Sequence, residues 1–295
     1  MATLSTATAG VRVAVVTGAT SGLGFEIARR LAVAGFQVVV VGRGEERAAA
    51  AAAEIARGTG RADVGAIGVV DLARPGDVRG LATKLLARYP SIHVLVNNAG
   101  RLFTHRDVTP DGLERTFALN VLAPFLLTSL LEERLRASAP ARVVNVASAA
   151  HYRQTVDFDN LQGERAFRGY RAYGRSKLEL LLLTREFARR WAGTGVTVNA
   201  VHPGFVASGF GQNNGGGMAF GIRLAGFLFG RSVRRGAETP VWAATDPSLT
   251  TVTGEYFSNR HRSRGDPASR DGVAAGRLWD ACAALLAGPP AAVAR

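Results

Sequence analysis

Tyr173 and Lys177 are the two residues whose types and spacing most directly suggest chemistry. They stand four positions apart in a stretch expected to be helical, so their side chains share one face. A free tyrosine has a pKa near ~10, and a neighbouring ammonium group favours the phenolate and lowers that pKa. We therefore expect Tyr173 to exchange a proton with a carbonyl or hydroxyl oxygen. Because a tyrosine four residues before a lysine is common by chance, this hypothesis depends on the residues that accompany the pair.

Two polar residues accompany the pair: Ser148 at the end of a predicted strand and Asn120 inside a long predicted helix. Ser148 could hydrogen-bond the same substrate oxygen and stabilise its developing charge. Pro124 has no N–H for the Asn120 carbonyl and opens that turn. A water bound to the freed carbonyl would link Lys177 to solvent. The alternatives without chemistry are a packed tyrosine, a serine that ends a strand and a helix kinked by proline alone.

A glycine segment, residues 17–24, joins a predicted strand to a predicted helix. Gly18 permits a tight turn, Gly22 lets the backbone approach a pyrophosphate, and Gly24 lets the helix pack closely on the sheet. The helix N-terminus would present free N–H groups to phosphates. The context of strand, turn and helix favours a dinucleotide site over an ordinary glycine-rich turn.

Arg43 lies just past the second predicted strand, where NAD enzymes usually place an acidic residue. A guanidinium group instead suits the 2′-phosphate of NADP, so we predict NADP(H) as cofactor. The alternative is a surface arginine paired with Glu45 or Glu46. Asp71 and Leu72, after the third strand, are placed to flank the adenine, although Asp is also a common turn residue.

The elements that must position these residues alternate regularly along the chain. Apolar runs predict strands at 13–17, 38–41, 67–70, 94–96, 143–146 and 196–201. Helical patterns occupy 22–34 and approximately 77–89, 112–136 and 172–191. The alternation predicts an α/β protein with a doubly wound parallel sheet, a Rossmann fold, in a single domain over residues 11–287. The glycine segment, Arg43, Asp71 and Ser148 each follow a strand, at the edge where such sheets bind ligands.

Three further segments have their own predictions. Residues 205–235 combine glycines, an apolar stretch and basic residues, and we expect a substrate lid there. A patch lying on a membrane surface and ordinary core packing are the alternatives. Residues 1–10 and 288–295 are expected to be flexible ends.

Composition narrows the function classes. The net charge is +13, but the basic residues are scattered and not interleaved with aromatics, so we expect no nucleic-acid partner. The chain has no apolar run long enough to span a membrane and no signal-like N-terminus, and Cys282 is its only cysteine. We therefore expect a cytoplasmic protein. No His, Cys, Asp or Glu cluster has the spacing of a metal site, so no metal is assigned. His151 is expected to border the substrate.

In this order and spacing the residues closely resemble the short-chain dehydrogenase/reductase superfamily, from about Val13 to Ser258. The resemblance implies a catalytic tetrad of Asn120, Ser148, Tyr173 and Lys177. It also implies a homo-oligomer that pairs through the helices bearing Asn120 and Tyr173. The expected cofactor-binding residues are Gly18, Thr20, Ser21, Gly22, Leu23, Gly24, Arg43, Asp71, Leu72, Asn98, Ala99, Gly100, Tyr173, Lys177, Pro203, Gly204 and Val206.

Finer motifs resemble the retinol dehydrogenase and WW-domain oxidoreductase branch. They are Ser-Ala-Ala-His at 148–151, Phe-Asp-Asn-Leu at 158–161, Val-His-Pro-Gly at 201–204 and Gly-Glu-Tyr-Phe at 254–257. This likeness implies an oxidoreductase that uses NADP(H) on apolar carbonyls or alcohols. One alternative is an enzyme like the sugar-nucleotide epimerases and dehydratases, although these normally have a different glycine spacing and a larger C-terminal lobe. The other is a non-catalytic regulator that senses NADP, which could dispense with the tetrad.

Overall fold

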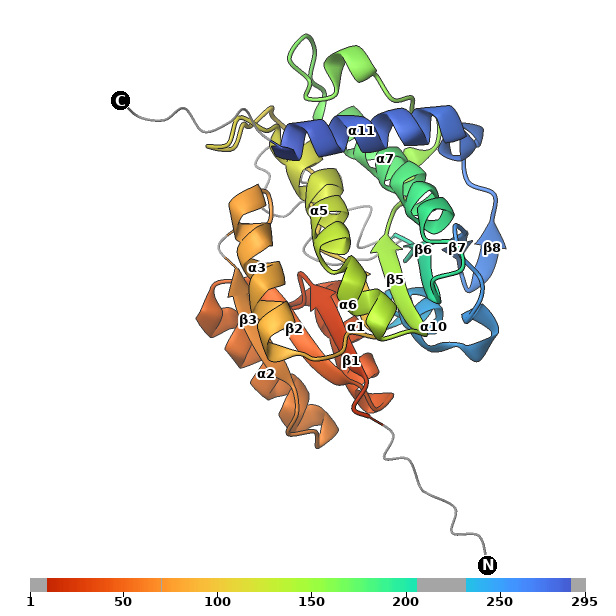
Figure 1. Ribbon diagram of the computed structural model, residues 1–295. Coiled ribbons are helices and arrows are strands. Elements are labelled where there is room, and N and C mark those ends of the chain that lie inside the picture. The colour runs from red at the N-terminus through yellow and green to blue at the C-terminus, as the bar shows by residue number, and fades with distance from the viewer. Residues whose placement is uncertain (1–9, 70, 206–231, 288–295) are drawn as a thin grey trace, which may run out of the picture.

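The computed structural model describes residues 10–69, 71–205 and 232–287. Within these ranges one eight-stranded sheet has the order β3-β2-β1-β4-β5-β6-β7-β8 (Figure 1). All neighbours are parallel except β8, which runs antiparallel to β7. The predicted doubly wound α/β Rossmann fold is confirmed. The strands are β1 Val13–Thr17, β2 Gln37–Arg43, β3 Gly65–Val69, β4 Val94–Asn97, β5 Ala141–Val146, β6 Val196–His202, β7 Tyr256–Ser258 and β8 His261–Ser263.

The central strands are buried on both faces because their sequences are almost wholly apolar. Every residue of β1 and β4 is buried, and so are the five residues from Val38 to Gly42 in β2. Runs of valine suit such strands, since branched side chains pack well on a pleated surface covered on both sides. The order β3-β2-β1-β4 places the ends of β1 and β4 next to each other, which is where the glycine segment and residues 98–100 follow.

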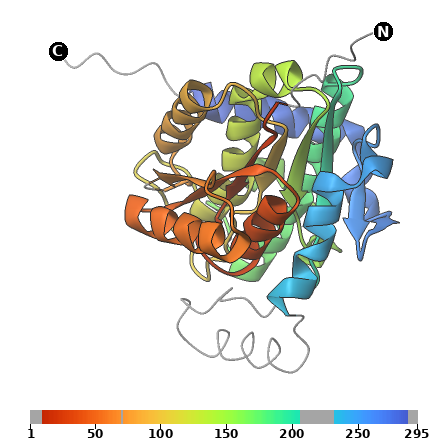
Figure 2. The same cartoon turned by 90° about the horizontal axis from the view of Figure 1, so that it is seen from below.

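Helices cover both faces of the sheet, as the view from below shows (Figure 2). On one face lie α1 Gly22–Val33, α2 Glu45–Thr59, α9 Val233–Gly236 and α10 Glu238–Thr245. Three of these helices contribute to one core cluster: α1 through Ile27, α2 through Ile55 and α10 through Ala243. On the other face lie α3 Pro75–Arg88, α5 Ala123–Leu130 and α7 Gly169–Arg190, which supply Leu81, Leu126 and Leu182 to a second cluster. Sequence analysis did not identify α2, whose alanine-rich sequence carries a weak pattern.

The C-terminal helix α11, Gly272–Ala287, lies across α7 (Figure 1). Its Trp279 contacts Phe125 of α5 and Phe187 of α7, with ring centroids 4.8 and 4.6 Å apart. Leu278 and Cys282 of α11 are fully buried. The helix therefore covers part of the surface through which the family resemblance implies pairing, and homo-oligomerisation stays a prediction.

The helix predicted over 112–136 is wrong as a continuous element. Glu114 ends the preceding turn and its carboxylate accepts from the backbone N–H groups of Thr116 and Phe117, so α4, Arg115–Phe117, begins later. A π-helical turn, η1 Ala118–Leu122, then precedes α5. Pro124 cannot donate to the carbonyl of Asn120, and the widened turn is the local response. A short α6, Glu132–Ala137, follows after Leu131.

The remaining segments are short turns of helix or lie outside the described residues. The polar excursion at 149–171 contains two 3₁₀ turns, η2 Ala149–His151 and η3 Phe158–Asn160, and two more follow later, η4 Pro247–Leu249 and η5 Pro267–Arg270. Most of the predicted lid, 206–231, lies outside the described residues, as do 1–9 and 288–295. Among the helices that are described, none is both long and apolar enough to cross a bilayer.

Candidate active site

The glycine segment forms a close contact between α1 and the sheet edge that leaves no room for a side chain. Gly18 and Gly22 have φ angles of +63° and +56°, which favour glycine. A Cβ atom placed on Gly24 would lie 2.2 Å from the carbonyl oxygen of Gly18 and 2.4 Å from Nδ2 of Asn98. The three glycines thus expose the backbone at the N-terminus of α1, a cradle that fits a dinucleotide pyrophosphate.

Residues 98 and 99 fasten the end of β4 to the end of β1. The Thr17 hydroxyl oxygen accepts from the backbone N–H groups of Asn98 and Ala99, each at 3.0 Å. In return, Nδ2 of Asn98 donates to the carbonyl oxygens of Thr17 at 2.9 Å and Gly18 at 3.2 Å. Thr17, Ala99 and Leu72 line one small pocket, so three parts of the predicted cofactor region adjoin.

Thr20 and Arg43 border the next part of this edge. A Cβ atom on Gly42 would lie 2.0 Å from the methyl carbon of Thr20, so an acidic residue would not fit at Gly42 as the backbone stands. Arg43 ends β2 with an exposed side chain, and no ion pair to it is found within the described ranges. Neither of its expected alternative partners holds it: Glu45 instead accepts from the backbone N–H of Gly68 at 3.0 Å.

Asp71 is engaged by its own turn. Its carboxylate accepts from the backbone N–H of Ala73 at 3.0 Å, and Nη2 of Arg115 lies 3.9 Å away. The Asp71 carboxylate therefore stabilises the turn before α3. Its neighbour in the chain, Leu72, lines the small pocket.

Arg101 is a basic residue at this edge that sequence reasoning missed. Burial lowers the pKa of Arg101, and the charges of Arg43 and Arg115 nearby lower it further. Its guanidinium lies 5.1 Å from the ring centre of Phe103. The available signal was its position directly after Gly100, in the turn that follows β4.

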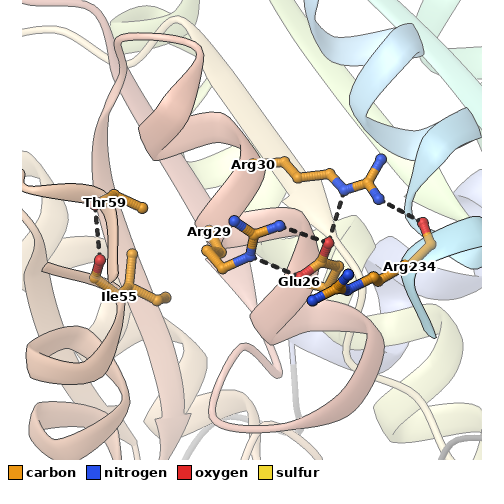
Figure 3. A network of polar contacts seen from close by, with 6 residues as sticks. All are labelled: Glu26, Arg29, Arg30, Ile55, Thr59 and Arg234. Carbon is orange, nitrogen blue, oxygen red and sulfur yellow. Dashed lines mark hydrogen bonds and ion pairs between the residues drawn. The ribbon is translucent and has the colours of Figure 1, made fainter. Parts of the chain in front are cut away.

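The body of α1 is held by an ion network on its outer side (Figure 3). Glu26 accepts from Arg29 at 2.8 and 2.9 Å and from Arg30 at 2.8 Å. These hydrogen bonds, that to Arg29 first, lower the pKa of the Glu26 carboxyl. Arg30 also donates to the carbonyl oxygen of Arg234 in α9, so the helix that begins at the glycine segment is joined to the last residues of the predicted lid, 205–235.

The four residues of the expected tetrad are brought together at the carboxyl edge of β4 and β5. Asn120 donates to Ser176 at 3.0 Å, and its Oδ1 accepts from the backbone N–H of Arg101 at 2.9 Å. A Cβ atom on Gly100 would lie 3.2 Å from both Asn120 Oδ1 and Lys177 Nζ. The turn at 98–100 thus contacts the glycine segment at one end and the tetrad at the other.

Tyr173 and Lys177 are both buried on α7. Lys177 Nζ donates to the carbonyl oxygen of Val146 at 3.0 Å and lies 5.6 Å from the Tyr173 ring centre. Burial lowers the pKa of Lys177 to about 8. Burial also raises the pKa of Tyr173 to about 12, while a hydrogen bond with Ser148 lowers it to a lesser extent. The expectation of a lowered tyrosine pKa is therefore wrong for the protein alone, because loss of solvation outweighs the hydrogen bond with Ser148.

Three exposed aromatic side chains lie on segments that carry predicted site residues. Tyr170 precedes Tyr173 by one turn of α7, Tyr152 follows the Ser148 turn, and Phe205 follows β6; their exposed fractions are 55%, 44% and 49%. Pro203 and Gly204 lie just after β6, and Gly204 has a φ of +85°. Val206 lies outside the described residues.

Two other predictions can be compared with the structure. His151 is fully buried, so the expectation that it borders the substrate is wrong. The described residues contain no group of three or more His, Cys, Asp or Glu side chains arranged to hold a metal ion.

The comparisons with known proteins agree with this geometry. The family model described as short chain dehydrogenase matches residues 12–217. Mouse retinol dehydrogenase 12 is 40% identical over 278 residues, which cover 93% of this chain and 86% of that protein. A putative uncharacterized protein from Mycobacterium paratuberculosis has a similar crystal structure, with a TM-score of 0.75, 27% identity and coverage of 95% and 94% of the two chains. The Pseudomonas aeruginosa RhlG/NADP active-site complex gives a TM-score of 0.67 at 29% identity, covering 84% of this chain and 94% of that one.

Proposed function

The chain belongs to the short-chain dehydrogenase family, in its retinol dehydrogenase-like branch, and we propose that it interconverts an alcohol and a carbonyl on an apolar small molecule with NADP(H). The observation that carries the proposal is the turn at 98–100. It contacts the glycine segment through Asn98 and the tetrad through Gly100, so a cofactor site and proton-transferring groups adjoin.

The proposed cofactor site uses the residues predicted from the sequence together with Arg101. Gly18, Gly22 and Gly24 leave the backbone free to approach a pyrophosphate. Arg43 and Arg101 would share the 2′-phosphate that distinguishes NADP from NAD. The RhlG structure was determined with NADP, which supports this choice. NADP(H) would supply or accept the hydride when bound.

The proton would come from Tyr173. With a pKa of about 12, Tyr173 keeps its hydroxyl proton at neutral pH and can donate it to a carbonyl oxygen. Ser148, which hydrogen-bonds Tyr173, is placed to donate to the same oxygen and stabilise its negative charge. Lys177 and Asn120 would keep the site in place through hydrogen bonds. Lys177 bonds to Val146, and Asn120 bonds to Arg101 and Ser176.

We infer an apolar substrate from exposed aromatic side chains on the segments that carry site residues. Tyr152, Tyr170 and Phe205 are three of the seven exposed large hydrophobic residues found in the described ranges, and all three lie on segments next to Ser148, Tyr173 or Gly204. Exposed aromatic side chains gathered at a site are typical of binding surfaces for apolar ligands.

The test is turnover of a panel of ketones, aldehydes and alcohols, followed by nicotinamide absorbance with both cofactors. Tyr173→Phe keeps the ring and removes the proton, so turnover should fall by roughly 100-fold or more while NADPH binding is kept. Tyr89→Phe, the same change at a tyrosine that follows α3 outside the candidate site, is the matched control. A Tyr173→Phe protein with the parent's turnover would exclude Tyr173 as the proton donor.

A further inference from the structure

His151 lies beside the candidate catalytic serine, and both of its ring nitrogens are hydrogen-bonded to backbone groups. Nδ1 lies 2.7 Å from the carbonyl oxygen of Ser148, and the backbone N–H of Asp266 donates to Nε2 at 3.1 Å. A carbonyl oxygen can only accept and an amide N–H can only donate. Together the two contacts assign the neutral tautomer, with its hydrogen on Nδ1.

The ring is enclosed as well as hydrogen-bonded. Its side chain is fully buried, between the rings of Tyr152 and Tyr256 at centroid distances of 4.2 and 5.1 Å. A Cβ atom on Gly265 would lie 3.3 Å from Nε2, so the neighbouring backbone already lies close to the ring. Water therefore cannot readily replace either hydrogen bond.

Asp266 connects this ring to a segment far away in the sequence. Its carboxylate accepts from the backbone N–H of Arg153 at 2.9 Å and from that of Ala268 at 3.0 Å. The residues before η5 are thus attached twice to the turn that follows Ser148, once through His151 and once through Arg153. None of these groups takes part in the tetrad.

We propose that His151 is a positioning residue, which fixes the Ser148 peptide, and with it the serine hydroxyl, by joining the Ser148 carbonyl to the Asp266 amide. The proposal rests on the proposed function, in which Ser148 and Tyr173 contact the substrate oxygen. The Ser148 hydroxyl also accepts from the backbone N–H of Ala150 at 3.2 Å, so a shift of this turn would displace the hydroxyl directly.

The arrangement requires an uncharged ring. Protonation would put a second N–H, on Nε2, against the N–H of Asp266, and that contact would be lost. The titratable and charged groups that face the ring are Asp266 from the C-terminal segment, Arg185 from α7, Tyr256 from β7 and the adjacent Tyr152. Burial is the largest influence and lowers the pKa of His151, so the ring stays neutral at neutral pH.

Two substitutions each keep one of the two hydrogen bonds of His151 and remove the other. In His151→Asn the amide nitrogen stands near the position of Nδ1 and can donate to Ser148, whereas in His151→Gln the amide oxygen can replace Nε2 as acceptor. His151→Phe keeps a ring and removes both. Because a displaced catalytic group can cost about 100-fold in rate, we expect His151→Phe to lower kcat by roughly that factor, with the dissociation constant for NADPH unchanged. His151→Asn should stay within about tenfold of the parent.

The exposed His261→Phe is the matched control and should match the parent. The pH dependence of kcat should also differ between the parent and His151→Asn. In the parent, protonation of His151 at low pH removes the contact with Asp266 and lowers kcat. The asparagine does not titrate, so this loss should be absent in the variant. Parent turnover in His151→Phe, or a His151→Asn protein no better than His151→Phe, would overturn the proposal.

A direct measurement decides the tautomer without any turnover. The imidazole ¹⁵N resonances of His151, assigned among the five histidines by their absence in His151→Asn, should show a protonated Nδ1 and an unprotonated Nε2 at neutral pH. The opposite tautomer or an imidazolium would overturn the proposal whatever the turnover of the variants. A parent without turnover on any substrate would instead count against the proposed function, and the resonances would still decide the assignment.

Discussion

The two halves of the site are built from different kinds of group. In the amino-terminal half, after β1, β2 and β4, backbone atoms meet at distances that only glycine permits, as Gly24 does against Gly18. The carboxyl-terminal half, after β5 and on α7, contains buried titratable side chains, among them Tyr173, Lys177 and His151. The first half should therefore be sensitive to added volume, and the second to protonation and lost hydrogen bonds.

Gly24→Ala is the substitution that should break the amino-terminal half most severely. The added Cβ would contact the Gly18 carbonyl and the Asn98 amide at distances that force the backbone to shift. We expect NADPH affinity to fall by about 100-fold, or ~2.8 kcal/mol. Overpacking should also lower the free energy of unfolding by ~1–3 kcal/mol. Fluorescence titration with NADPH and denaturant unfolding measure the two effects.

Gly58→Ala is the control for this prediction. Gly58 lies in α2, and a Cβ atom there would meet nothing within 4 Å. Its substitution should leave NADPH affinity unchanged and stability equal or slightly higher, since alanine favours the helix. Parent-like affinity in Gly24→Ala would show that the glycine contact does not shape the cofactor site.

Lys177 gives the corresponding test of the carboxyl-terminal half. Its pKa is about 8 in the folded protein, below the ordinary value of 10.5, so above about pH 8 the unfolded chain binds more protons than the folded one. Stability must then rise with pH by up to ~1.4 kcal/mol per pH unit, or ~2 kcal/mol between about pH 8 and 10 allowing for partial titration at each end. The raised pKa of Tyr173 acts in the opposite direction, but mainly above about pH 10.

The measurement is the difference in the free energy of unfolding between the parent and Lys177→Met across that pH range. The difference cancels groups that both proteins share, and it should grow in the parent's favour as the pH rises. Lys84→Met, at an exposed position of α3, should produce no such slope. A flat difference for Lys177→Met would mean that the buried ammonium is solvated or paired better than its surroundings indicate.

The same contrast explains what could be predicted from the sequence. The glycine segment, the strand ends and the α7 pair are local features, in which spacing alone brings Gly18 near Gly24 and Tyr173 near Lys177. The protonation states of the site, by contrast, depend on contacts between residues that are distant in sequence. The bond between His151 and Asp266 spans 115 positions, and the burial that raises the Tyr173 pKa comes from the whole fold. A spacing rule therefore predicted which residues meet and gave the wrong direction for the tyrosine pKa.

The broken helix at Asn120 shows the same limit at shorter range. Pro124 was enough to predict an opened turn, because a missing N–H is a property of one residue. It did not predict the π turn at 118–122 or the capping by Glu114, which depend on how the flanking residues pack. Helix α11 was missed altogether, since its burial depends on the aromatic rings of α5 and α7.

Arg43 and Arg101 are the exception in the amino-terminal half, because they act through charge, and their substitution should have the smallest effect. Arg43→Ala should weaken NADPH binding by about tenfold, or ~1.4 kcal/mol, and leave NADH binding unchanged. The effect is modest since Arg43 is exposed and solvent screens its charge. Arg101→Ala should act in the same direction, and raising the salt concentration should reduce both effects. Arg57→Ala, at an exposed position near the end of α2, should change neither affinity. Equal affinities of the parent for NADPH and NADH would contradict the assignment of the 2′-phosphate to these arginines, and the glycine contact alone would then account for dinucleotide binding.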